Sequence, residues 1–182
     1  EAYFHSMSLI RDPMRSQLYS EAFKSELGGY SAKMVFEDHA SRANTDDPLA
    51  LIQYIDTHTY LIGDINTKVD RASMAHSLEV REPLMDHQLV EWLATLPSSM
   101  KMRGQESKFL LKKAMEPHLP QDIMYRQKMG FSVPLDRWLR GPLRHRVRAA
   151  LLEGRIAESG MFNLATIRQI IEQHESGMRN HS

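Results

Sequence analysis

Charged side chains gather between positions 70 and 86, among small and apolar residues. They are Asp70, Arg71, Glu79, Arg81 and Asp86. Glu79 and Arg81 would share a face if the backbone is extended, because side chains two residues apart lie on one side of a strand. A carboxylate flanked by guanidinium groups near a break in structure could bind an amine or act as a general base. An ion-pair network that only stabilises a helix end fits the same residues.

Lys128 is a second candidate for chemistry. It lies two residues before Gly130, in a stretch that is closed by Phe131 and Pro134 and is typical of a loop. A lysine in such a loop can reach inward and place a positive point charge beside a phosphate. An exposed lysine with no part in chemistry is the alternative interpretation.

Several kinds of site are excluded or not indicated. The chain has no cysteine, which excludes disulfides, thiolate metal sites and a catalytic thiol. Its nine histidines include no pair three or four residues apart, so the sequence predicts no metal site. The glycine-rich phosphate-binding patterns G-x-x-x-x-G-K-S/T and G-x-G-x-x-G are also missing.

The elements that would position these residues are mainly helices. The sequence predicts helices over residues 47–62, 64–77, 86–96, 107–115 and 163–177. In these ranges apolar residues recur at helical intervals, or residues typical of helix ends stand at the boundaries. Asp47 before Pro48 is a good helix start, and Asn163 is a good N-cap for the last helix. Pro83 favours an extended backbone just before it, which breaks the helical pattern over residues 77–83.

The sequence predicts no sheet within this chain. No alternation of period two spans more than a few residues. Residues 1–45 show no clear pattern apart from a loop at Gly28 and Gly29, and prolines between 117 and 142 limit helices to short pieces. We therefore expect a mainly helical fold with one long irregular segment.

The composition is that of an ordinary globular chain. Of its 182 residues, 42% are hydrophobic and 25% are charged, which argues against disorder. No apolar run approaches the roughly 20 residues of a membrane span. The 23 basic and 23 acidic residues cancel, so no global field would attract nucleic acid or a membrane. We expect neither partner.

The charges are nevertheless separated along the chain. Residues 37–91 hold eleven acids against four bases, and residues 126–148 hold seven bases against Asp136 alone. The two segments could pair with each other in the folded chain. Alternatively, part of the basic segment could face a polyphosphate or a nucleic acid.

Several motifs resemble, in the right order, the C-terminal part of the synthetase domain of glutamine-dependent asparagine synthetases. They are YLIGD at 60–64, KVDRASMA at 68–75, SLEVREPLMDH at 77–87, KFLLK at 108–112, LP at 119–120, RQKMGF at 126–131 and WLR at 138–140. The resemblance extends over about two thirds of the chain. Such an ordered series is more specific than any single motif.

The resemblance implies a fold. The chain would be the helical C-terminal portion of an α/β adenine-nucleotide α-hydrolase-like (ATP pyrophosphatase) domain, with the parallel sheet upstream and missing here. Residues 1–182 would be this portion, truncated at both ends, with 1–45 a leading segment of unassigned role and 142–182 the terminal helices. The family's glutaminase and its S-G-G-x-D-S phosphate loop are also missing from the sequence. We therefore expect the fragment alone to be inactive.

The resemblance also implies a reaction. In the family, ATP activates the side-chain carboxylate of aspartate as an adenylate, and glutamine-derived ammonia then displaces AMP. Glu79 matches the glutamate of the S-L-E-V-R motif, implied to bind or deprotonate ammonia. Lys128 matches the lysine of the R-Q-K motif, implied to stabilise charge on the phosphates. Arg81 would bind a substrate carboxylate, and Asp70 and Arg71 would complete the substrate-binding set by orienting the segment that carries Glu79.

The remaining implications concern cofactors and substrates. The resemblance implies ATP and Mg²⁺, with the principal Mg²⁺ ligands upstream, and a cytoplasmic enzyme that uses aspartate and glutamine or ammonia. Glu82 replaces an apolar residue that is usual after the arginine, and an acid there could alter the pocket lip or face water. A diverged family member that amidates another carboxylic acid is the alternative, and a helical nucleic-acid-binding module is a third hypothesis.

Overall fold

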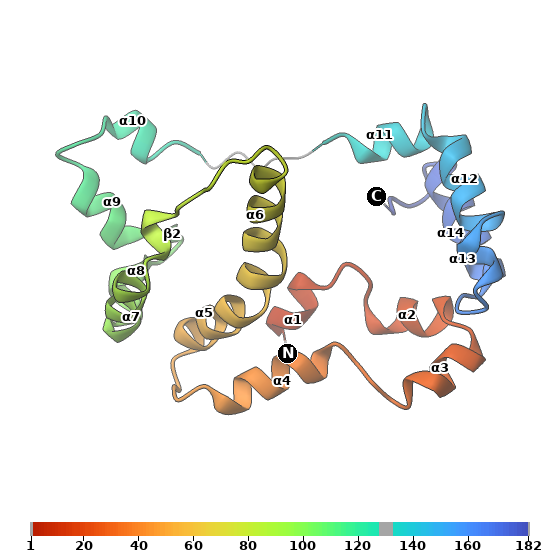
Figure 1. The fold of residues 1–182 in the computed structure, drawn as a ribbon, viewed down its shortest axis with the longest axis horizontal. Coiled ribbons are helices and arrows are strands. Elements are labelled where there is room, and N and C mark those ends of the chain that lie inside the picture. Colours follow the sequence, from red (N-terminus) through yellow and green to blue (C-terminus); the bar gives the residue numbers. More distant parts are fainter. Residues whose placement is uncertain (1, 128–132, 182) are drawn as a thin grey trace. The chain divides into compact units, whose positions relative to one another are not determined.

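The structure is a computed structural model that describes residues 2–127 and 133–181. The chain divides into two compact units (Figure 1). Residues 1–31 together with 129–182 form unit 1, and residues 32–128 form unit 2. The described backbone is mostly helical, as the sequence predicts.

The elements of unit 2 follow one another along the middle of the chain. They are α4 (Lys33–Arg42), α5 (Pro48–His58), η1 (Leu61–Asn66), α6 (Thr67–Met74), η2 (Pro83–Met85), α7 (His87–Thr95), α8 (Ser98–Lys101), β1 (Met102–Arg103), β2 (Glu106–Ser107), α9 (Phe109–Met115) and α10 (Gln121–Met124). The helices of unit 1 come from both ends of the chain. They are α1 (Ala2–Met7), α2 (Asp12–Leu18), α3 (Glu21–Leu27), α11 (Leu135–Arg140), α12 (Arg144–Leu152), α13 (Arg155–Glu158) and α14 (Leu164–Glu175).

Helix α5 begins where the sequence predicts. Asp47 is its N-cap, because Asp47 Oδ1 accepts a hydrogen bond from Ala50 N at 2.9 Å, and Pro48 occupies the first turn. The same Oδ1 accepts a hydrogen bond from Ser98 Oγ at 2.7 Å. One carboxylate thus starts α5 and ties it to the first residue of α8. Ile55, also on α5, is buried.

The helix expected over residues 47–62 ends earlier than predicted. Helix α5 stops at His58, and η1 is a π-helix that leads directly into α6. Thr67 Oγ1 donates a hydrogen bond to Ile62 O at 2.8 Å, five residues back, in keeping with the wider π-helical turn. Turns of this kind are frequent at functional sites, and this one ends at Asn66.

The expectation of no sheet needs a small correction. Strands β1 and β2 pair antiparallel, with Met102 opposite Ser107 and Arg103 opposite Glu106. Each strand has two residues, which is too short for a period-two pattern to reveal it. Gly104, with a φ of 59°, provides the left-handed backbone of the turn between them.

Residues 1–45 contain four helices, α1 to α4, although their sequence shows no clear pattern. The loop predicted at the double glycine is present. Gly28 has a φ of 56° and its N–H donates to Ser25 O, which ends α3. These helices are six to ten residues long. Helices this short contain only two or three turns, too few for a helical spacing of apolar residues to be recognised in the sequence.

Helix α14 provides the core of unit 1. Ile167, Ile171 and His174 follow each other at intervals of four and three residues, so they share a face, and all three are buried. Asn163 caps the helix as predicted, because its Oδ1 accepts hydrogen bonds from two backbone N–H groups of the first turn.

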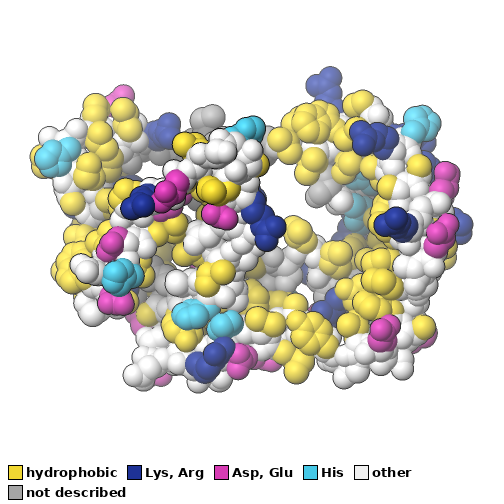
Figure 2. All heavy atoms as spheres, in the orientation of Figure 1, with side chains coloured by type: hydrophobic (Ala, Val, Ile, Leu, Met, Phe, Trp, Pro, Cys, Tyr) yellow, Lys and Arg dark blue, Asp and Glu magenta, His cyan; other side chains and the backbone are white. Residues whose placement is uncertain are grey.

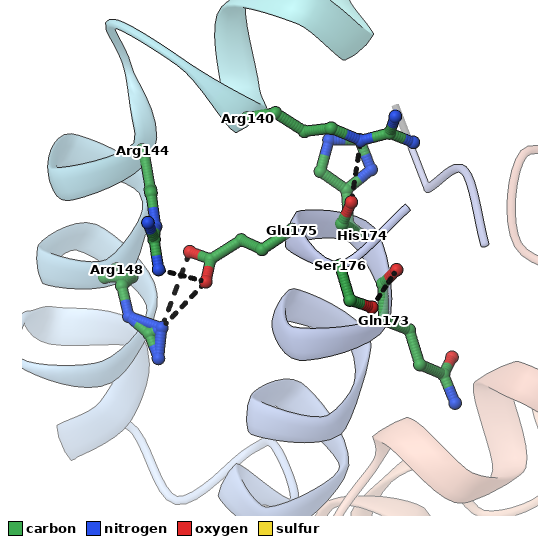
Figure 3. A network of polar contacts seen from close by, with 7 residues as sticks. All are labelled: Arg140, Arg144, Arg148, Gln173, His174, Glu175 and Ser176. Atoms are coloured by element: carbon green, nitrogen blue, oxygen red, sulfur yellow. Dashed lines mark hydrogen bonds and ion pairs between the residues drawn. The ribbon is translucent and has the colours of Figure 1, made fainter. Parts of the chain in front are cut away.

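An ion-pair network joins α12 to α14 (Figure 3). Arg144 Nη2 lies 3.0 Å and Arg148 Nη1 lies 3.2 Å from Glu175 Oε2. The hydrogen bond from Arg144 is the main reason that the pKa of Glu175 lies below its ordinary value. Arg140 Nε donates to His174 O at 2.7 Å and so satisfies a carbonyl near the end of α14.

Within each unit, the described ion pairs join charges of that unit. Arginines of the basic segment contact acids of their own unit, as Arg140 does with Asp136 at 2.9 Å. Acids of residues 37–91 pair with close neighbours, as Asp38 does with Arg42 one helical turn away. Counts of acidic and basic residues do not identify ion-pair partners, because several different pairings neutralise the same residues.

Hydrophobic side chains are widely exposed (Figure 2). Among the described residues, those that are buried are Ile55, Ile167 and Ile171. Single exposed apolar residues are common on protein surfaces. Because few apolar side chains are buried here, polar contacts such as those of Asp47 should contribute a larger share of the stability of each unit. Within residues 2–127 and 133–181, no helix combines the length and the apolar character needed to cross a membrane.

We predict that Asp47→Ala lowers the melting temperature by about 4–8 °C, because α5 loses its N-cap and its tie to Ser98 together. The hydrogen bond from Ser98 holds the pKa of Asp47 below its ordinary value of 3.8. The stabilisation is therefore fully present at neutral pH and is lost as the pH falls through the lowered pKa. Circular dichroism melts measure the effect, with exposed Asp46→Ala as the control. Equal melting of the two variants would contradict it.

We predict that Glu175→Gln destabilises unit 1 by at most about 1 kcal/mol at pH 7, because its two arginine partners are partly exposed and solvent screens the pairs. Since the pKa of Glu175 is lowered, wild type should lose this advantage as the pH falls below the ordinary value of 4.5. Denaturant unfolding at several pH values measures it. Glu172→Gln on the exposed face of α14 is the control. A difference in unfolding free energy between wild type and Glu175→Gln that grows at acidic pH would contradict the prediction.

Candidate functional site

Helix α6 ends in a left-handed turn. Ser77 has a φ of 58°, a conformation that L-residues other than asparagine and aspartate rarely adopt. Leu78 N donates to Ser73 O and Ser77 N donates to Met74 O, each at 3.0 Å. This pair of bonds is the Schellman pattern of helix termination. The turn stops the helical path two residues before Glu79.

The segment after the turn carries Glu79 and Arg81. It has neither helical nor strand hydrogen bonding up to Pro83, as that proline predicts. Arg81 Nε donates to Glu79 Oε1 at 2.8 Å, so the expectation that the two side chains share a face is confirmed. The Glu79 side chain is 69% exposed and that of Arg81 is 86% exposed. Both can therefore reach a ligand, and water screens their attraction.

A cavity of about 380 Å³ lies between α6 and this segment, and we name it the α6 cavity. Its lining residues are Asn66, Val69, Asp70, Ser73, Met74, Glu79, Val80, Glu82 and Met85. The first five are spaced three, four, seven and eight residues after Asn66, which places them on one face of a helix. The turn brings the other four against that face.

The polar groups of the α6 cavity are mostly hydrogen-bond acceptors. Asp70 and Glu82 form no ion pair with any residue that the structure describes, and Glu79 is paired with Arg81. Asn66 Oδ1 is buried and accepts no hydrogen bond from the described residues. A buried oxygen of this kind costs free energy unless a donor reaches it. Ser73 Oγ, a donor among the lining residues, is engaged by Asp70 O at 3.1 Å.

The predicted site residues fall in different places. Asp70 and Glu79 line the α6 cavity, and Arg81 touches it through its bond to Glu79. Arg71 lies on α6, is exposed and stands outside the lining. Lys128 lies outside the described residues, so its place in the site stays a prediction.

Asp86 has a structural position. Its Oδ1 accepts hydrogen bonds from Gln88 N at 2.9 Å and Leu89 N at 3.3 Å, which makes it the N-cap of α7. Of the two interpretations of the charged residues between 70 and 86, the structural one therefore applies to Asp86. Its side chain starts the next helix instead of facing the cavity.

Sequence reasoning missed Asn66 and Ser73 as lining residues. Their positions four before and three after Asp70 are a helical signal that could have found them, had the face of Asp70 been traced along the helix. Glu82 stood out only as a departure from a family pattern. Its place in the cavity depends on the turn at Ser77, which no motif indicates.

A second polar cluster lies where α9 and α10 end, with Glu116 and Tyr125 as the C-cap residues of these helices. Tyr125 Oη donates to Glu116 Oε1 at 2.5 Å, and Lys113 Nζ lies 2.7 Å from the same oxygen. The hydrogen bond from Lys113, followed by that from Tyr125, holds the pKa of Glu116 below its ordinary value, and the bond to Glu116 raises the pKa of Tyr125. These groups satisfy one another, so the cluster is a structural link.

The described residues do not fit a metal ion. Within the two described ranges, no group of three or more histidine, aspartate or glutamate side chains lies close enough together to hold one. An oxygen-bound divalent cation needs several such ligands converging on one point.

Comparison with known proteins identifies the family. The family model described as asparagine synthase matches residues 2–182. The chain belongs to the asparagine synthase family. The family assignment made from the motifs is therefore confirmed, and the residues of the α6 cavity lie within the matched region.

Several known proteins are similar to this chain over most of its length. A Mycobacterium tuberculosis (strain H37Rv) protein that bears the name of a glutamine-hydrolysing asparagine synthetase is 35% identical over 142 residues, which cover 75% of this chain and 21% of that protein. Glutamine-hydrolysing asparagine synthetase 1 of Bacillus subtilis (strain 168) is 28% identical over 164 residues, covering 87% and 26%. The Penicillium rubens amidase chyE is 23% identical over 133 residues, covering 69% and 20%. This chain therefore spans about a fifth to a quarter of these relatives. No solved structure matches.

We predict that Glu79→Ala and Arg81→Ala each change the free energy of unfolding by less than about 0.5 kcal/mol, because both side chains are exposed and their pair is screened. Urea unfolding followed by circular dichroism measures this. Asp86→Ala, which removes the N-cap of α7, is the comparison and should cost about 1 kcal/mol. A loss above about 2 kcal/mol at Glu79 would assign this carboxylate to the fold instead of the site.

Proposed function

We propose that this chain forms part of the amide-forming active site of a glutamine-dependent, AMP-forming asparagine synthetase. The observation that carries the proposal is Glu79, an exposed carboxylate that lines the α6 cavity of a chain matched by the asparagine synthase family over residues 2–182. Since the chain spans 21% and 26% of two relatives, the glutaminase and the phosphate-binding loop would lie elsewhere in the complete protein. The 182 residues alone would be inactive.

The first step would activate aspartate. An oxygen of its side-chain carboxylate attacks the α-phosphorus of ATP, a carboxyl–phosphorus bond forms, and pyrophosphate leaves with the electrons of the broken phosphorus–oxygen bond. Negative charge shifts among the phosphate oxygens during this exchange. Lys128, through its match to the R-Q-K motif, would place a fixed positive charge there. Such a group aimed at developing charge lowers a barrier by about 3 kcal/mol or more.

The second step would form the amide. The nitrogen of ammonia attacks the acyl carbon, AMP leaves with the electrons of the carbon–oxygen bond, and the nitrogen gives up a proton. Glu79 would bind the nitrogen and accept that proton. Arg81 holds Glu79 Oε1 at 2.8 Å and so orients the carboxylate. A positioned general base of this kind typically contributes about 10²–10⁴-fold in rate.

The other predicted substrate-binding residues differ in how well the geometry supports them. Asp70 lines the same cavity as Glu79 and would face the same ligand. Arg81 uses Nε for Glu79, so a substrate carboxylate would meet its two Nη groups. Arg71 would act from outside the lining, where it orients α6 instead of touching the ligand.

ATP and Mg²⁺ would be needed by this reaction. The described residues do not fit a Mg²⁺ site, because their acids do not converge. No metal-dependent step is therefore assigned to them, and the principal Mg²⁺ ligands would belong to another part of the complete protein. The reaction would take place in the cytoplasm.

A diverged acid substrate is the second candidate function. The similarity to a protein named an amidase, amidase chyE, favours it, since that name differs from those of the synthetases. Glu82 favours it as well, because this acid lines the cavity where the family pattern has an apolar residue. A nucleic-acid-binding module has less support, because Glu175 pairs with two arginines of the basic segment.

We predict that Glu79→Gln and Lys128→Ala separate the two steps in the complete polypeptide. With ATP, Mg²⁺, aspartate and ammonia, Glu79→Gln should slow asparagine formation about 100-fold or more, while aspartate-dependent exchange of pyrophosphate into ATP continues, because only the nitrogen step needs the base. Lys128→Ala should slow both readouts by roughly 100-fold.

The control for these measurements is Lys113→Ala, which removes an exposed lysine of α9 and should leave both rates unchanged. Asparagine formation at the wild-type rate in Glu79→Gln would remove Glu79 from the site. Turnover of another carboxylic acid in place of aspartate would favour the diverged function instead.

A further inference from the structure

His174 is a buried titratable side chain that the proposed mechanism does not use. It lies on the face of α14 that also carries Ile167 and Ile171. His181 N donates a hydrogen bond to His174 Nδ1 at 3.1 Å. A backbone N–H can only donate, so Nδ1 presents its lone pair and the ring proton lies on Nε2. This contact therefore requires the neutral form of the His174 ring.

The other ring nitrogen faces a carboxylate that it does not reach. His174 Nε2 lies 3.7 Å from Asp136 Oδ1, which is too long for a hydrogen bond. Both atoms are buried, and neither forms a hydrogen bond with a described residue. Arg140 lies beside them: its Nη2 is 2.9 Å from the same Oδ1, and its Nε donates to His174 O (Figure 3). A positively charged ring at residue 174 would thus have an anionic partner close at hand.

The segment that follows α14, residues 178–181, folds back over the last turn of this helix. Arg179 N donates to Gln173 O at 3.1 Å, and His181 N donates to His174 Nδ1. The His181 ring contributes a further contact, because its Nε2 lies 3.1 Å from Gln173 Oε1. Of these contacts, the bond to Nδ1 is lost if His174 takes up a proton. We call the segment docked when that bond is present.

Other charges surround this contact. Helices α2, α11 and α12 pack against α14. Their charged and titratable side chains, together with those of segment 178–181, are Asp12, Arg15, Asp136, Arg137, Arg140, Arg144, His145, Arg146, Arg148, Arg179 and His181. Asp12 pairs with Arg15 at 2.8 Å, and Arg144 and Arg148 pair with Glu175. Asp136 is the described carboxylate within ion-pairing distance of the His174 ring.

The second histidine of the contact is less suited to take up a proton. Burial, followed by the charges of Arg179 and His174, lowers the pKa of His181. The same arrangement places the positive charge of Arg179 in the docked segment, whereas the negative charge of Asp136 belongs to α11. A charge on His174 would therefore favour α11 over the segment.

We propose that protonation of His174 releases segment 178–181 from α14, so that unit 1 contains a pH-sensitive switch. With a proton on Nδ1, two N–H donors would face each other where one hydrogen bond now lies. The charged ring pairs with Asp136 instead. The released state binds the proton more tightly than the docked state, so a fall in pH shifts the population toward release. Histidine is the side chain whose charge ordinarily changes between pH 5 and 8. The inference does not depend on the proposed function.

Release would open an apolar cavity of unit 1. This cavity has a volume of about 610 Å³, and Arg179, Asn180 and His181 form part of its wall. Apolar side chains of α14 line it as well, among them Ile167 and Ile171, which are buried while the segment is docked. The switch would thus control the exposure of an apolar surface.

Hydrogen exchange on the complete polypeptide tests the proposal. Mass spectrometry follows amide exchange at about pH 7.5 and about pH 5.5, and division by the rate of the unstructured chain at the same pH gives a protection factor. We expect protection of the Arg179 and His181 amides to fall at least about tenfold, because one proton changes an equilibrium by up to tenfold per pH unit. The amides of Ile167 and Ile171 should keep their protection, which distinguishes release from unfolding of α14.

Four variants assign the effect. His174→Asn offers an amide oxygen that can accept from His181 N but cannot take up a proton, so protection should change less than about twofold with pH. Asp136→Asn should move the loss of protection to lower pH, and its side chain is 40% exposed, so this variant should fold. His181→Ala keeps the backbone donor and should behave as wild type does. His5→Asn, a histidine of α1, is the matched control.

The proposal is overturned if protection of the Arg179 and His181 amides in wild type is the same at both pH values, or if Ile171 loses protection equally. The wild-type loss in His174→Asn has the same consequence, and Asp136→Asn decides in the same way should His174→Asn not fold. Disappearance of the loss in His181→Ala would assign it to the ring of His181 and would also overturn the proposal. None of these readouts requires turnover, so they stand apart from the test of the proposed function.

Discussion

The candidate site depends on one backbone constraint, the left-handed turn at Ser77. Nine residues separate Asp70 from Glu79, and nine residues of continuous α-helix would rotate one about 180° from the other, onto opposite faces. The Schellman bonds end the helix first and reverse the chain, so that both acids line the α6 cavity. A serine in a conformation that favours glycine carries strain, and such strain is commonly found where geometry serves function.

The sequence was most informative where a residue has a local mechanism. Asp47 and Asn163 cap their helices as predicted, because an N-cap is satisfied within three residues. The π-helix and the two-residue strands were missed, since their hydrogen bonds depend on packing and leave no periodic signal. The partner of Arg144 and Arg148 was missed for a related reason. Glu175 lies 31 and 27 residues away along the chain, and a count of charged residues does not show which of them lie close together in the fold.

The site was predicted in part. The spacing of Glu79 and Arg81 predicted their contact because extended backbone has a fixed alternation of faces. The cavity could not be predicted, since it requires α6 and the following segment to meet. Asn66 shows this limit clearly. It ends a π-helix that the apolar spacing does not indicate, and the burial of its Oδ1 depends on how the folded chain packs around it.

The weakness of the Glu79–Arg81 pair in water is itself part of the functional argument. Two exposed charges at 2.8 Å gain little from each other while solvent screens them, so the pair is not needed to hold the fold. The same charges interact more strongly once a ligand displaces water and the local dielectric falls. A ligand that enters the α6 cavity would therefore strengthen the ion pair that orients Glu79. Binding and alignment of the base would then favour each other.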